Sequence, residues 1–278
     1  MIIAVASGKG GTGKTTVAVG LALSLPQCQF VDADAEEPNC HLFLRPVIER
    51  TIPVPMILPE VDLSKCTFCG KCAEFCQFNA MAVVKQKVLI FPELCHGCGG
   101  CIYACPEEAI QAGQRQIGEV EVGTARGMRF IQGRLKPAEP SAVRIVRQEI
   151  AMLEPNGVAV VDASPGTACA VQDTVDEADF CLLVTEPTPF GLHDLKMAMD
   201  TAQEVGTPAG VIINRSGPRD DLIEQECRKR DLPILLRIPF DRRIAEAYSR
   251  GEPIVDAFPE WRDRFQQVYA EIERRVNQ

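Results

Sequence analysis

Short apolar segments alternate with longer segments of helical periodicity along most of the chain. The segments with strand character lie at residues 2–7, 29–34, 157–164, 180–186, 209–214 and 234–239. The helical patterns lie near residues 14–25, 141–153, 191–205, 219–230, 241–250 and 259–276. Short apolar strands separated by helix-length segments are typical of a parallel sheet with helices on both faces. The pattern therefore predicts an α/β fold with a doubly wound, mostly parallel sheet.

The alternation breaks off at residues 59–113, where strand-length apolar runs are few and cysteines are frequent. An internal repeat with an offset of 29 residues aligns Cys66 with Cys95 and Cys76 with Cys105. Insertion of a duplicated small module into a larger domain is the simplest explanation of such a repeat.

Two domains are expected on this basis. Residues 1–58 and 114–278 would form the α/β domain, and residues 59–113 would form a small inserted α+β domain. The alternating apolar positions within residues 113–140 predict a hairpin that leads back into the main sheet.

The composition is that of an ordinary globular protein of 278 residues, with 46% hydrophobic and 24% charged residues. A formal net charge of -9 argues against a large cationic surface for nucleic acid or anionic lipid. No apolar run approaches the roughly 18 residues of a membrane span, and the first residues lack the features of a signal peptide. We expect a cytoplasmic protein that neither binds nucleic acid nor inserts into a membrane.

Cysteine is unusually frequent, with 13 residues. In a reducing compartment, clustered cysteines are more often metal ligands or catalytic thiols than disulfides. The cysteines therefore point to a metal-binding function for the inserted domain.

A glycine-rich segment, "GKGGTGKT", spans residues 8–15 and matches the pattern G-x-x-x-x-G-K-[ST]. It follows an apolar strand and precedes a helical segment, as a phosphate-binding loop does. Its backbone N–H groups would surround a triphosphate, Lys14 would neutralise the β and γ oxygens, and the Thr15 hydroxyl would bind Mg²⁺. The alternative is a glycine-rich turn without a ligand. The candidate nucleotide-binding residues are Gly8, Lys9, Gly10, Gly11, Thr12, Gly13, Lys14, Thr15 and Thr16.

The second lysine of this loop, Lys9, makes "KGGTGKT" resemble the deviant Walker A motif of the MinD/ParA family of P-loop ATPases. That family includes the nitrogenase iron protein and the Mrp-type iron–sulfur scaffold ATPases. The resemblance implies a homodimer with ATP at the interface, in which Lys9 reaches the nucleotide of the partner. A solvated loop charge is the alternative for Lys9.

Two aspartates at strand ends fit the same resemblance. Asp34 in "VDADAEEPN" would lie in switch I and orient the attacking water, and Asp162 in "VVDASPG" would belong to the Mg²⁺ shell as the Walker B residue. Phosphoryl transfer needs little beyond positioned water, Mg²⁺ and lysines that hold charge. Taken alone, either aspartate is equally well explained as the cap of a helix or turn.

The resemblance also extends to two segments that bind the base in the family. It suggests that Asn214 contacts adenine and that Pro239 and Asp241 line the adenine pocket. An asparagine at the end of a strand is often only a turn former, so the signal is less specific here.

Each cysteine run reads C-x2-C-x2-C-x3-C, the bacterial ferredoxin spacing in which the fourth cysteine binds the other cluster. The spacing predicts two [4Fe-4S] clusters. Zinc, which also accepts four thiolates, is the alternative, but its sites usually pair two C-x2-C units. Gln77 replaces the proline that follows the fourth cysteine, whereas Pro106 is present in the second run. The ligands would be Cys66, Cys69, Cys72 and Cys105 for cluster one, and Cys95, Cys98, Cys101 and Cys76 for cluster two.

The remaining candidates receive simpler interpretations. His96, between two cysteines, is expected to be a solvated loop residue. Cys169 lies seven residues beyond Asp162, where a cysteine in the nitrogenase iron protein binds a shared cluster, but a small buried apolar side chain is the default.

The segment 260–278 predicts an amphipathic helix with four acidic and four basic residues, which should dock on the sheet rather than on lipid.

The combination of motifs resembles ferredoxin-containing MinD-like ATPases, whose nucleotide domain is also described as cobyrinic acid a,c-diamide synthase-like. It implies an Mg²⁺-dependent ATPase that binds ATP or ADP and couples its nucleotide state to two [4Fe-4S] clusters. The first hypothesis is a role in iron–sulfur or metal-cofactor assembly with an acceptor protein. The second is ATP-gated electron donation to a redox partner, and a positioning or partitioning ATPase is less favoured.

Overall fold

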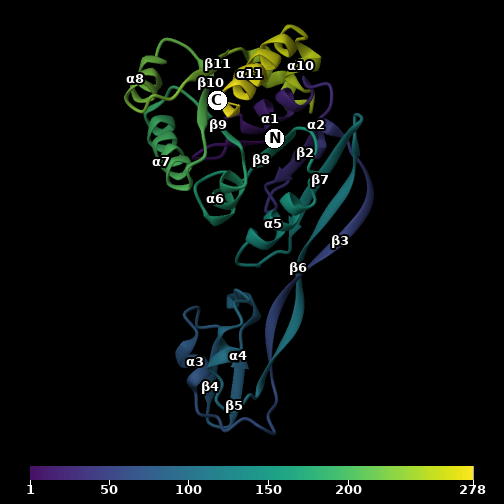
Figure 1. The fold of residues 1–278 in the computed structure, drawn as a ribbon, viewed down its shortest axis with the longest axis vertical. Coiled ribbons are helices and arrows are strands. Elements are labelled where there is room, and N and C mark those ends of the chain that lie inside the picture. Colours follow the sequence, from purple (N-terminus) through teal and green to yellow (C-terminus); the bar gives the residue numbers. More distant parts are fainter. Residues whose placement is uncertain (278) are drawn as a thin grey trace.

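A nine-stranded sheet forms the centre of the chain in a computed structural model that describes residues 1–277 (Figure 1). The strand order is β11-β10-β9-β1-β8-β2-β7-β6-β3. The first seven strands in this order pair in parallel, which confirms the mostly parallel sheet. Their bounds are β1 Ile2–Ala6, β2 Gln29–Ala33, β7 Met128–Leu135, β8 Ala159–Ala163, β9 Phe180–Thr185, β10 Ala209–Ser216 and β11 Ile234–Pro239.

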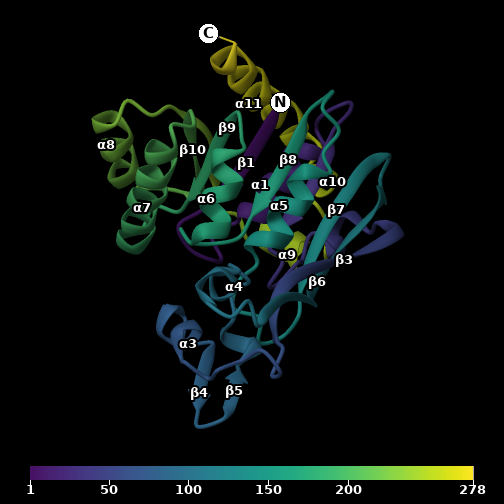
Figure 2. The same ribbon diagram turned by 60° about the horizontal axis from the view of Figure 1, so that its bottom comes forward.

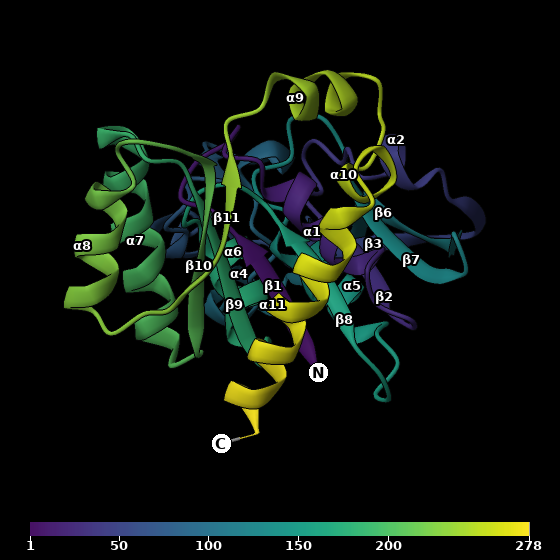
Figure 3. The ribbon, with the colours of Figure 1, turned by 90° about the horizontal axis from the view of Figure 1, so that it is seen from above.

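Helices cover both faces of this sheet, as the alternation of segments predicts (Figure 3). Successive strand residues point to opposite faces, so Phe30 and Val160 pack with the α1 side while Val31 and Val161 pack with the α5 side. One face carries α1 (Lys14–Ala22), α10 (Ile254–Ala257) and α11 (Glu260–Val276). The other carries α5 (Val143–Ala151), α6 (Cys169–Asp176), α7 (Pro189–Val205) and α8 (Asp221–Lys229). Two further helices are α2 (His41–Leu44) and α9 (Arg242–Ser249).

The last helix, α11, packs against α1 and against strand β11, in agreement with the expected docking on the sheet. Trp261, Phe265, Val268 and Ile272 are buried along one side of it. Gly20 of α1 leaves the space that the Phe265 ring fills, because a Cβ there would lie 2.6 Å from the ring. Within residues 1–277, no helix combines the length and the apolar character that crossing a membrane requires.

Two long strands, β3 (Val47–Val61) and β6 (Ile110–Ala125), form an antiparallel ribbon at one edge of the sheet. One end of the ribbon joins the sheet through β6 and β7, and this hairpin confirms the one expected within residues 113–140. The other end projects beyond the α/β body and carries residues 62–109 (Figure 1). The ribbon is therefore the link between the two parts of the molecule.

Strand β3 is absent from the sequence-based prediction for a physical reason. Pro53, Pro55 and Pro59 lack the N–H groups that a central strand needs, and such residues argue against a strand. Because β3 is the last strand of the sheet, half of its N–H groups face no neighbour and the prolines are tolerated.

The small unit at the end of the ribbon contains α3 (Lys71–Phe75), α4 (Gly100–Ala104) and a hairpin of β4 (Met81–Val84) and β5 (Lys87–Ile90). A short 3-10 helix, η1 (Pro92–Leu94), precedes the second cysteine run. The 29-residue repeat extends to backbone conformation, because equivalent residues have positive φ angles. These pairs are Phe68 (58°) and Gly97 (64°), Gly70 (79°) and Gly99 (72°), and Asn79 (53°) and Glu108 (47°).

Candidate functional site

The glycine-rich loop lies at the carboxyl end of β1 and leads directly into α1. Gly13 has a left-handed backbone, with a φ of 92°, and Lys14 is the first helical residue. A side chain at Gly8 would overlap the backbone of Asp194, with a Cβ only 2.1 Å from its carbonyl oxygen. The loop thus presents the N-terminus of a buried helix, which favours an anionic ligand such as phosphate.

Asp162 connects this loop to the neighbouring strand. It stands in β8 opposite Val5 of β1, so its carboxylate lies beside the start of α1. Lys14 Nζ is 2.6 Å from Asp162 Oδ1, and Thr15 Oγ1 donates to Asp162 Oδ2 over 2.7 Å. The structure therefore brings together the two loop residues and the carboxylate predicted for the nucleotide and Mg²⁺ site.

The charge of Lys14 is maintained by this contact. Burial by itself would lower the pKa of Lys14, but the ion pair with Asp162 outweighs burial and raises the pKa above its usual value. Lys14 and Asp162 are both buried, so the pair is poorly screened by solvent. A polyphosphate that approached the loop would offer Lys14 an alternative anionic partner.

Asp32, a buried carboxylate, also belongs to the site, although its position in the sequence predicts no role for it. It stands in β2 opposite Asp162, and its Oδ2 accepts from the backbone N–H groups of Asn39 (2.9 Å) and Cys40 (2.8 Å). Burial, together with the negative charge of Asp162, raises the pKa of Asp32 to about 7. Asp32 therefore fixes the turn between β2 and α2.

Asp34, the predicted switch I residue, lies just beyond β2 and is partly exposed. Burial raises its pKa to about 6, while the nearby charge of Lys14 acts in the opposite direction. Asp34 is thus mainly ionised at neutral pH, as a residue that orients water must be. Its predicted role in hydrolysis stays a prediction.

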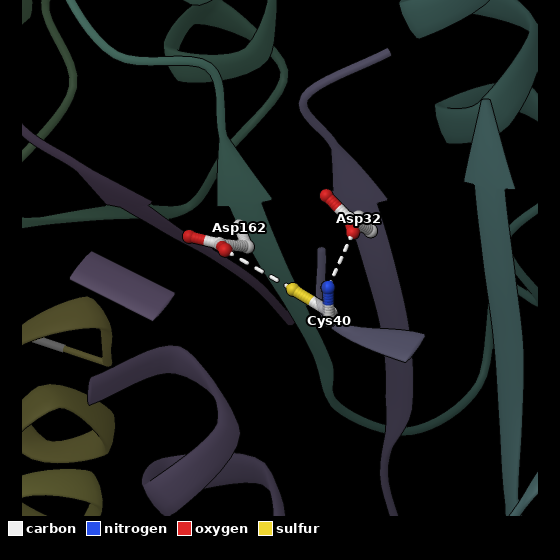
Figure 4. Close-up of side chains that lie close together, drawn as sticks. All are labelled: Asp32, Cys40 and Asp162. Atoms are coloured by element: carbon white, nitrogen blue, oxygen red, sulfur yellow. Dashed lines mark hydrogen bonds between the residues drawn. The ribbon is translucent and has the colours of Figure 1, made fainter. Parts of the chain in front are cut away.

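Cys40 is a second residue of the site without a signal in the sequence. Its Sγ donates to Asp162 Oδ2 over 3.2 Å, and its side chain is fully buried (Figure 4). One donor atom each from Asp32, Cys40 and Asp162 lie within 4.8 Å of one another. Two carboxylates and a thiol at this separation are suitable ligands for a divalent cation.

Lys9 makes ion pairs within its own chain. Its Nζ lies 2.8 Å from Glu186 Oε1 and 4.0 Å from Asp194 Oδ2. The other oxygen of Glu186 accepts from Arg215 Nη1 over 2.8 Å. In this conformation the ion pairs hold the Lys9 side chain, so it is not a solvated loop charge. The phosphate-binding loop does not determine where its ammonium group lies.

The residues predicted to bind adenine occupy the same edge of the sheet. Asn214 Nδ2 donates to the Thr12 carbonyl over 2.7 Å, so it packs against the phosphate loop. Pro239 pairs with Ser216 at the carboxyl ends of β11 and β10. Asp241 Oδ1 caps α9 by accepting from the Arg243 N–H over 2.8 Å. Contact of the three predicted residues with a base stays a prediction.

The eight cysteines of the two runs surround two separate cavities in the small unit. Each cavity receives three cysteines from one run and the fourth from the other, and these are the two sets of four that the spacing predicts. Apolar side chains of β4 and β5 or of the ribbon complete the walls. The first cavity is lined by Cys66, Cys69, Cys72 and Cys105, and the second by Cys95, Cys98, Cys101 and Cys76.

The thiols within each cavity influence one another. Burial, and then the neighbouring Cys105 and Cys66, raise the pKa of Cys72. Burial, and then Cys95 and Cys98, raise the pKa of Cys101 to about 11. Such thiols stay protonated at neutral pH unless a cation replaces the protons. Four sulfur donors around one cavity are suitable ligands for zinc or for an iron–sulfur cluster.

The fourth cysteine of each run has an additional hydrogen bond. The Ala80 N–H donates to Cys76 Sγ and the Ala109 N–H donates to Cys105 Sγ, each over 3.3 Å. These equivalent bonds orient the two sulfurs that cross between the runs. Hydrogen bonds to sulfur also tune the reduction potential of an iron–sulfur cluster.

The exposure expected from the sequence is wrong for Cys169 and correct for His96. Cys169 is exposed at the start of α6, so the expectation of a buried apolar side chain is wrong. It follows the "SPGTA" turn, which carries the chain out of the sheet before the helix begins. His96 is exposed, as expected, and stacks on Phe78 with 3.9 Å between ring centroids.

Comparison with known proteins gives results that agree with this geometry. Residues 3–254 match the model of the CobQ/CobB/MinD/ParA nucleotide binding domain. An uncharacterized protein of Methanocaldococcus jannaschii is 30% identical over 91% of this chain and 90% of its own length.

Solved structures show the same fold at low sequence identity. The cell division ATPase MinD of Pyrococcus furiosus is similar with a TM-score of 0.58 and 21% identity, over 98% of both chains. The septum site-determining protein MinD of Pyrococcus horikoshii, complexed with Mg-ADP, gives 0.60 and 20%, over 98% of this chain and 96% of its own.

The raised pKa of Asp32 predicts a pH-dependent stability. Between about pH 4 and pH 7 the folded state keeps a proton on Asp32 that the unfolded state releases, so stability falls as pH rises through this window. Asp32→Asn removes this term while keeping a side-chain acceptor for the two N–H groups. From pH 5 to pH 8, without nucleotide, wild type should lose about 2.5 kcal/mol more unfolding free energy than the variant.

Denaturant unfolding at both pH values measures this difference. Asp263→Asn, a change of an exposed aspartate of α11, is the matched control. Equal pH slopes for wild type and Asp32→Asn would contradict the assignment.

Proposed function

Because the chain belongs to the family of CobQ/CobB/MinD/ParA nucleotide binding domains and is an ATPase of that family, we propose that it couples ATP binding and hydrolysis to two [4Fe-4S] clusters. ATP with Mg²⁺ would occupy the loop at the start of α1. The clusters would occupy the two cavities lined by cysteines, in a ferredoxin-like inserted domain of residues 59–113.

The nucleotide part of the proposal relies on the contacts of Asp162. When a polyphosphate takes over the charge of Lys14, the Asp162 carboxylate and the Thr15 hydroxyl become available to the Mg²⁺ shell. Asp34, ionised at neutral pH, would orient water toward the terminal phosphate. These roles require only that groups are positioned and that charge is stabilised, and phosphoryl transfer requires little else from a protein.

The observation that carries the cluster part is the crossed grouping of the cysteines. Each cavity combines three closely spaced sulfurs of one run with the last sulfur of the other. Zinc sites rarely use such crossed runs, whereas two-cluster ferredoxins do. When bound, a [4Fe-4S] cluster supplies one-electron chemistry, and the apolar walls limit the access of water to it.

Of the two roles, the geometry favours electron donation to a redox partner over cluster delivery to an acceptor. Release of either cluster would require both runs to open, because Cys76 and Cys105 each serve the cavity of the other run. Cys69 and Cys98 are exposed, so one edge of each cavity lies at the surface, where an electron can leave without any rearrangement.

We also propose that the chain forms a homodimer. Lys9 would exchange its ion pair with Glu186 for the nucleotide of a second copy of the chain. This exchange would bring a lysine to the phosphates only when two chains associate. ATP would then act as the switch between single chains and a closed dimer.

Iron content tests the cluster assignment directly. Protein purified without oxygen should contain about eight iron and eight sulfide ions per chain. Cys98→Ser should lower the iron count to about four, because it removes a ligand of one cavity only. Cys169→Ser, a change of an exposed cysteine outside the runs, is the control and should keep about eight. A zinc content of two with no sulfide would overturn the cluster proposal.

Turnover in the presence of an iron(II) chelator separates the two roles. For an electron donor, iron should stay at about eight per chain during ATP hydrolysis. Protein that has been reduced beforehand and freed of excess reductant should pass its electrons to a viologen dye faster with MgATP than with MgADP. An ATP-dependent loss of iron to the chelator, without faster dye reduction, would favour assembly instead.

The dimer role of Lys9 predicts a separation of binding from association. Lys9→Gln should bind MgATP with little change, since Lys14 remains, but should stay monomeric in sedimentation experiments where wild type with MgATP dimerises. Lys196→Gln, a change of a half-exposed lysine of α7, is the control and should dimerise normally. ATP-dependent dimers of Lys9→Gln would show that Lys9 acts within its own chain.

A further inference from the structure

Helix α5 contacts three parts of the molecule that are distant in sequence. Near its start, Arg144 Nη2 donates to the Gly97 carbonyl over 3.0 Å, within the second cysteine run. In its middle, Arg147 makes two hydrogen bonds of 2.8 and 3.1 Å to Asp173 of α6. In its last turn, Glu149 packs beside the segment that follows β2. One nine-residue helix thus joins a cysteine run to α6 and to the segment of Asp34, the residue predicted for switch I.

The peptide of Gly97 is fixed from three sides. Its carbonyl accepts from Arg144, and its N–H donates to Cys95 Sγ over 3.4 Å. The Met56 side chain fills the place of a Cβ, because one at Gly97 would lie only 2.4 Å from it. A displacement of Arg144 would therefore move Gly97 and change the N–H···S contact to Cys95.

The other end of α5 is in contact with the segment after Asp34. A Cβ at Gly133 of β7 would lie 2.3 Å from Ile145, 2.8 Å from Glu149 and 3.1 Å from Ala35, so these side chains meet at one point. Ala35 directly follows Asp34 and accepts from the Leu135 N–H over 2.8 Å. A shift of Asp34 would thus change the packing of Ala35 beside α5.

Glu149 makes this contact without a charge. It is fully buried, and among residues 1–277 neither of its carboxylate oxygens has a hydrogen-bond partner. Burial, and then the nearby Asp32, raise its pKa well above the usual value, so the side chain is neutral. Among residues 1–277 Glu149 makes no ion pair, and packing holds this end of α5 beside Ala35.

The first cysteine run lies farther from α5. Its cavity is closed by Val83 and Val88 of the hairpin and by Val61 and Ile110 at the far end of the ribbon. In Figure 2, α4 of the second run lies on the side of the α/β body, whereas the hairpin projects away from it. Within the described chain, no hydrogen bond or ion pair joins residues 66–72 to the α/β body.

We infer that the two clusters respond unequally to the nucleotide: the cavity of Cys76, Cys95, Cys98 and Cys101 is the responsive one, and Arg144 is the positioning residue that connects it to the nucleotide site. The inference rests on the proposed function and adds to it which of the two clusters responds to the nucleotide. The cluster nearer the ATPase body is the one tuned by nucleotide, and the farther one keeps a constant environment.

Hydrogen exchange of the cluster-loaded protein tests the inference without relying on activity. With MgATP in place of MgADP, amide exchange in residues 95–101 should change at least twofold in rate, while residues 66–72 should not change. In Arg144→Gln, the response of residues 95–101 should be lost, while the response near Asp34 and the ATPase rate should remain. Arg144→Lys, which can still donate to the Gly97 carbonyl, should restore the response.

The control is Arg262→Gln. Arg262 of α11 also donates to a backbone carbonyl, that of Leu23, on the opposite face of the sheet. This variant should respond like wild type. The inference is overturned if both runs respond equally, if only residues 66–72 respond, or if Arg144→Gln keeps the wild-type response.

EPR spectra of the reduced protein give a second measurement. A nucleotide-dependent change of the signal should persist in Cys69→Ser and disappear in Cys98→Ser. The reverse pattern would overturn the inference while leaving the proposed function intact. The proposed function itself fails if wild type, with about eight irons per chain, shows no nucleotide effect on either run by either method.

Discussion

The buried ion pair between Lys14 and Asp162 is the contact on which the arrangement of the nucleotide site depends. It joins the start of α1 to β8, two segments separated by 148 residues in the sequence. Thr15 and Cys40 donate to the same carboxylate, so three side chains are oriented around Asp162. A buried ion pair is weak evidence for stability, since desolvation offsets much of its attraction. Its value here is positional, because it holds a lysine and a carboxylate where a polyphosphate and a metal ion would separate them.

The sheet explains why so many charged groups meet there. β1, β8 and β2 are adjacent and parallel, so their carboxyl ends lie at one edge, and Asp32 and Asp162 stand in register across β2 and β8. Ligands of open α/β sheets bind at this edge. Burial, and then the proximity of the Asp162 carboxylate, raise the pKa of Asp32 to about 7. The protonation of Asp32 therefore depends on any cation that is placed within the site.

The sequence predicts those parts of the molecule that depend on local pattern. The central strands, the covering helices and the phosphate loop follow from apolar runs and spacing, and the crossed grouping of cysteines follows from the interval between them. Contacts made only in three dimensions leave no such signal. Cys40 has no spacing that marks it, and Lys9 meets Glu186 far along the chain. Strand β3 was hidden by its prolines, which only its position at the edge of the sheet permits.

The crossing of Cys76 and Cys105 between the cavities has a consequence for biosynthesis. A chain that emerges from its N-terminus can assemble only three sulfurs of the first cavity until Cys105 has been made. At that moment β6, β7 and β8 are still missing, so β3 has no partner and the sheet lacks its middle. If the cavities hold the proposed clusters, their insertion could not precede synthesis of the whole small unit, yet it could precede closure of the sheet. The small unit would then acquire its iron before the α/β domain has folded around its nucleotide site.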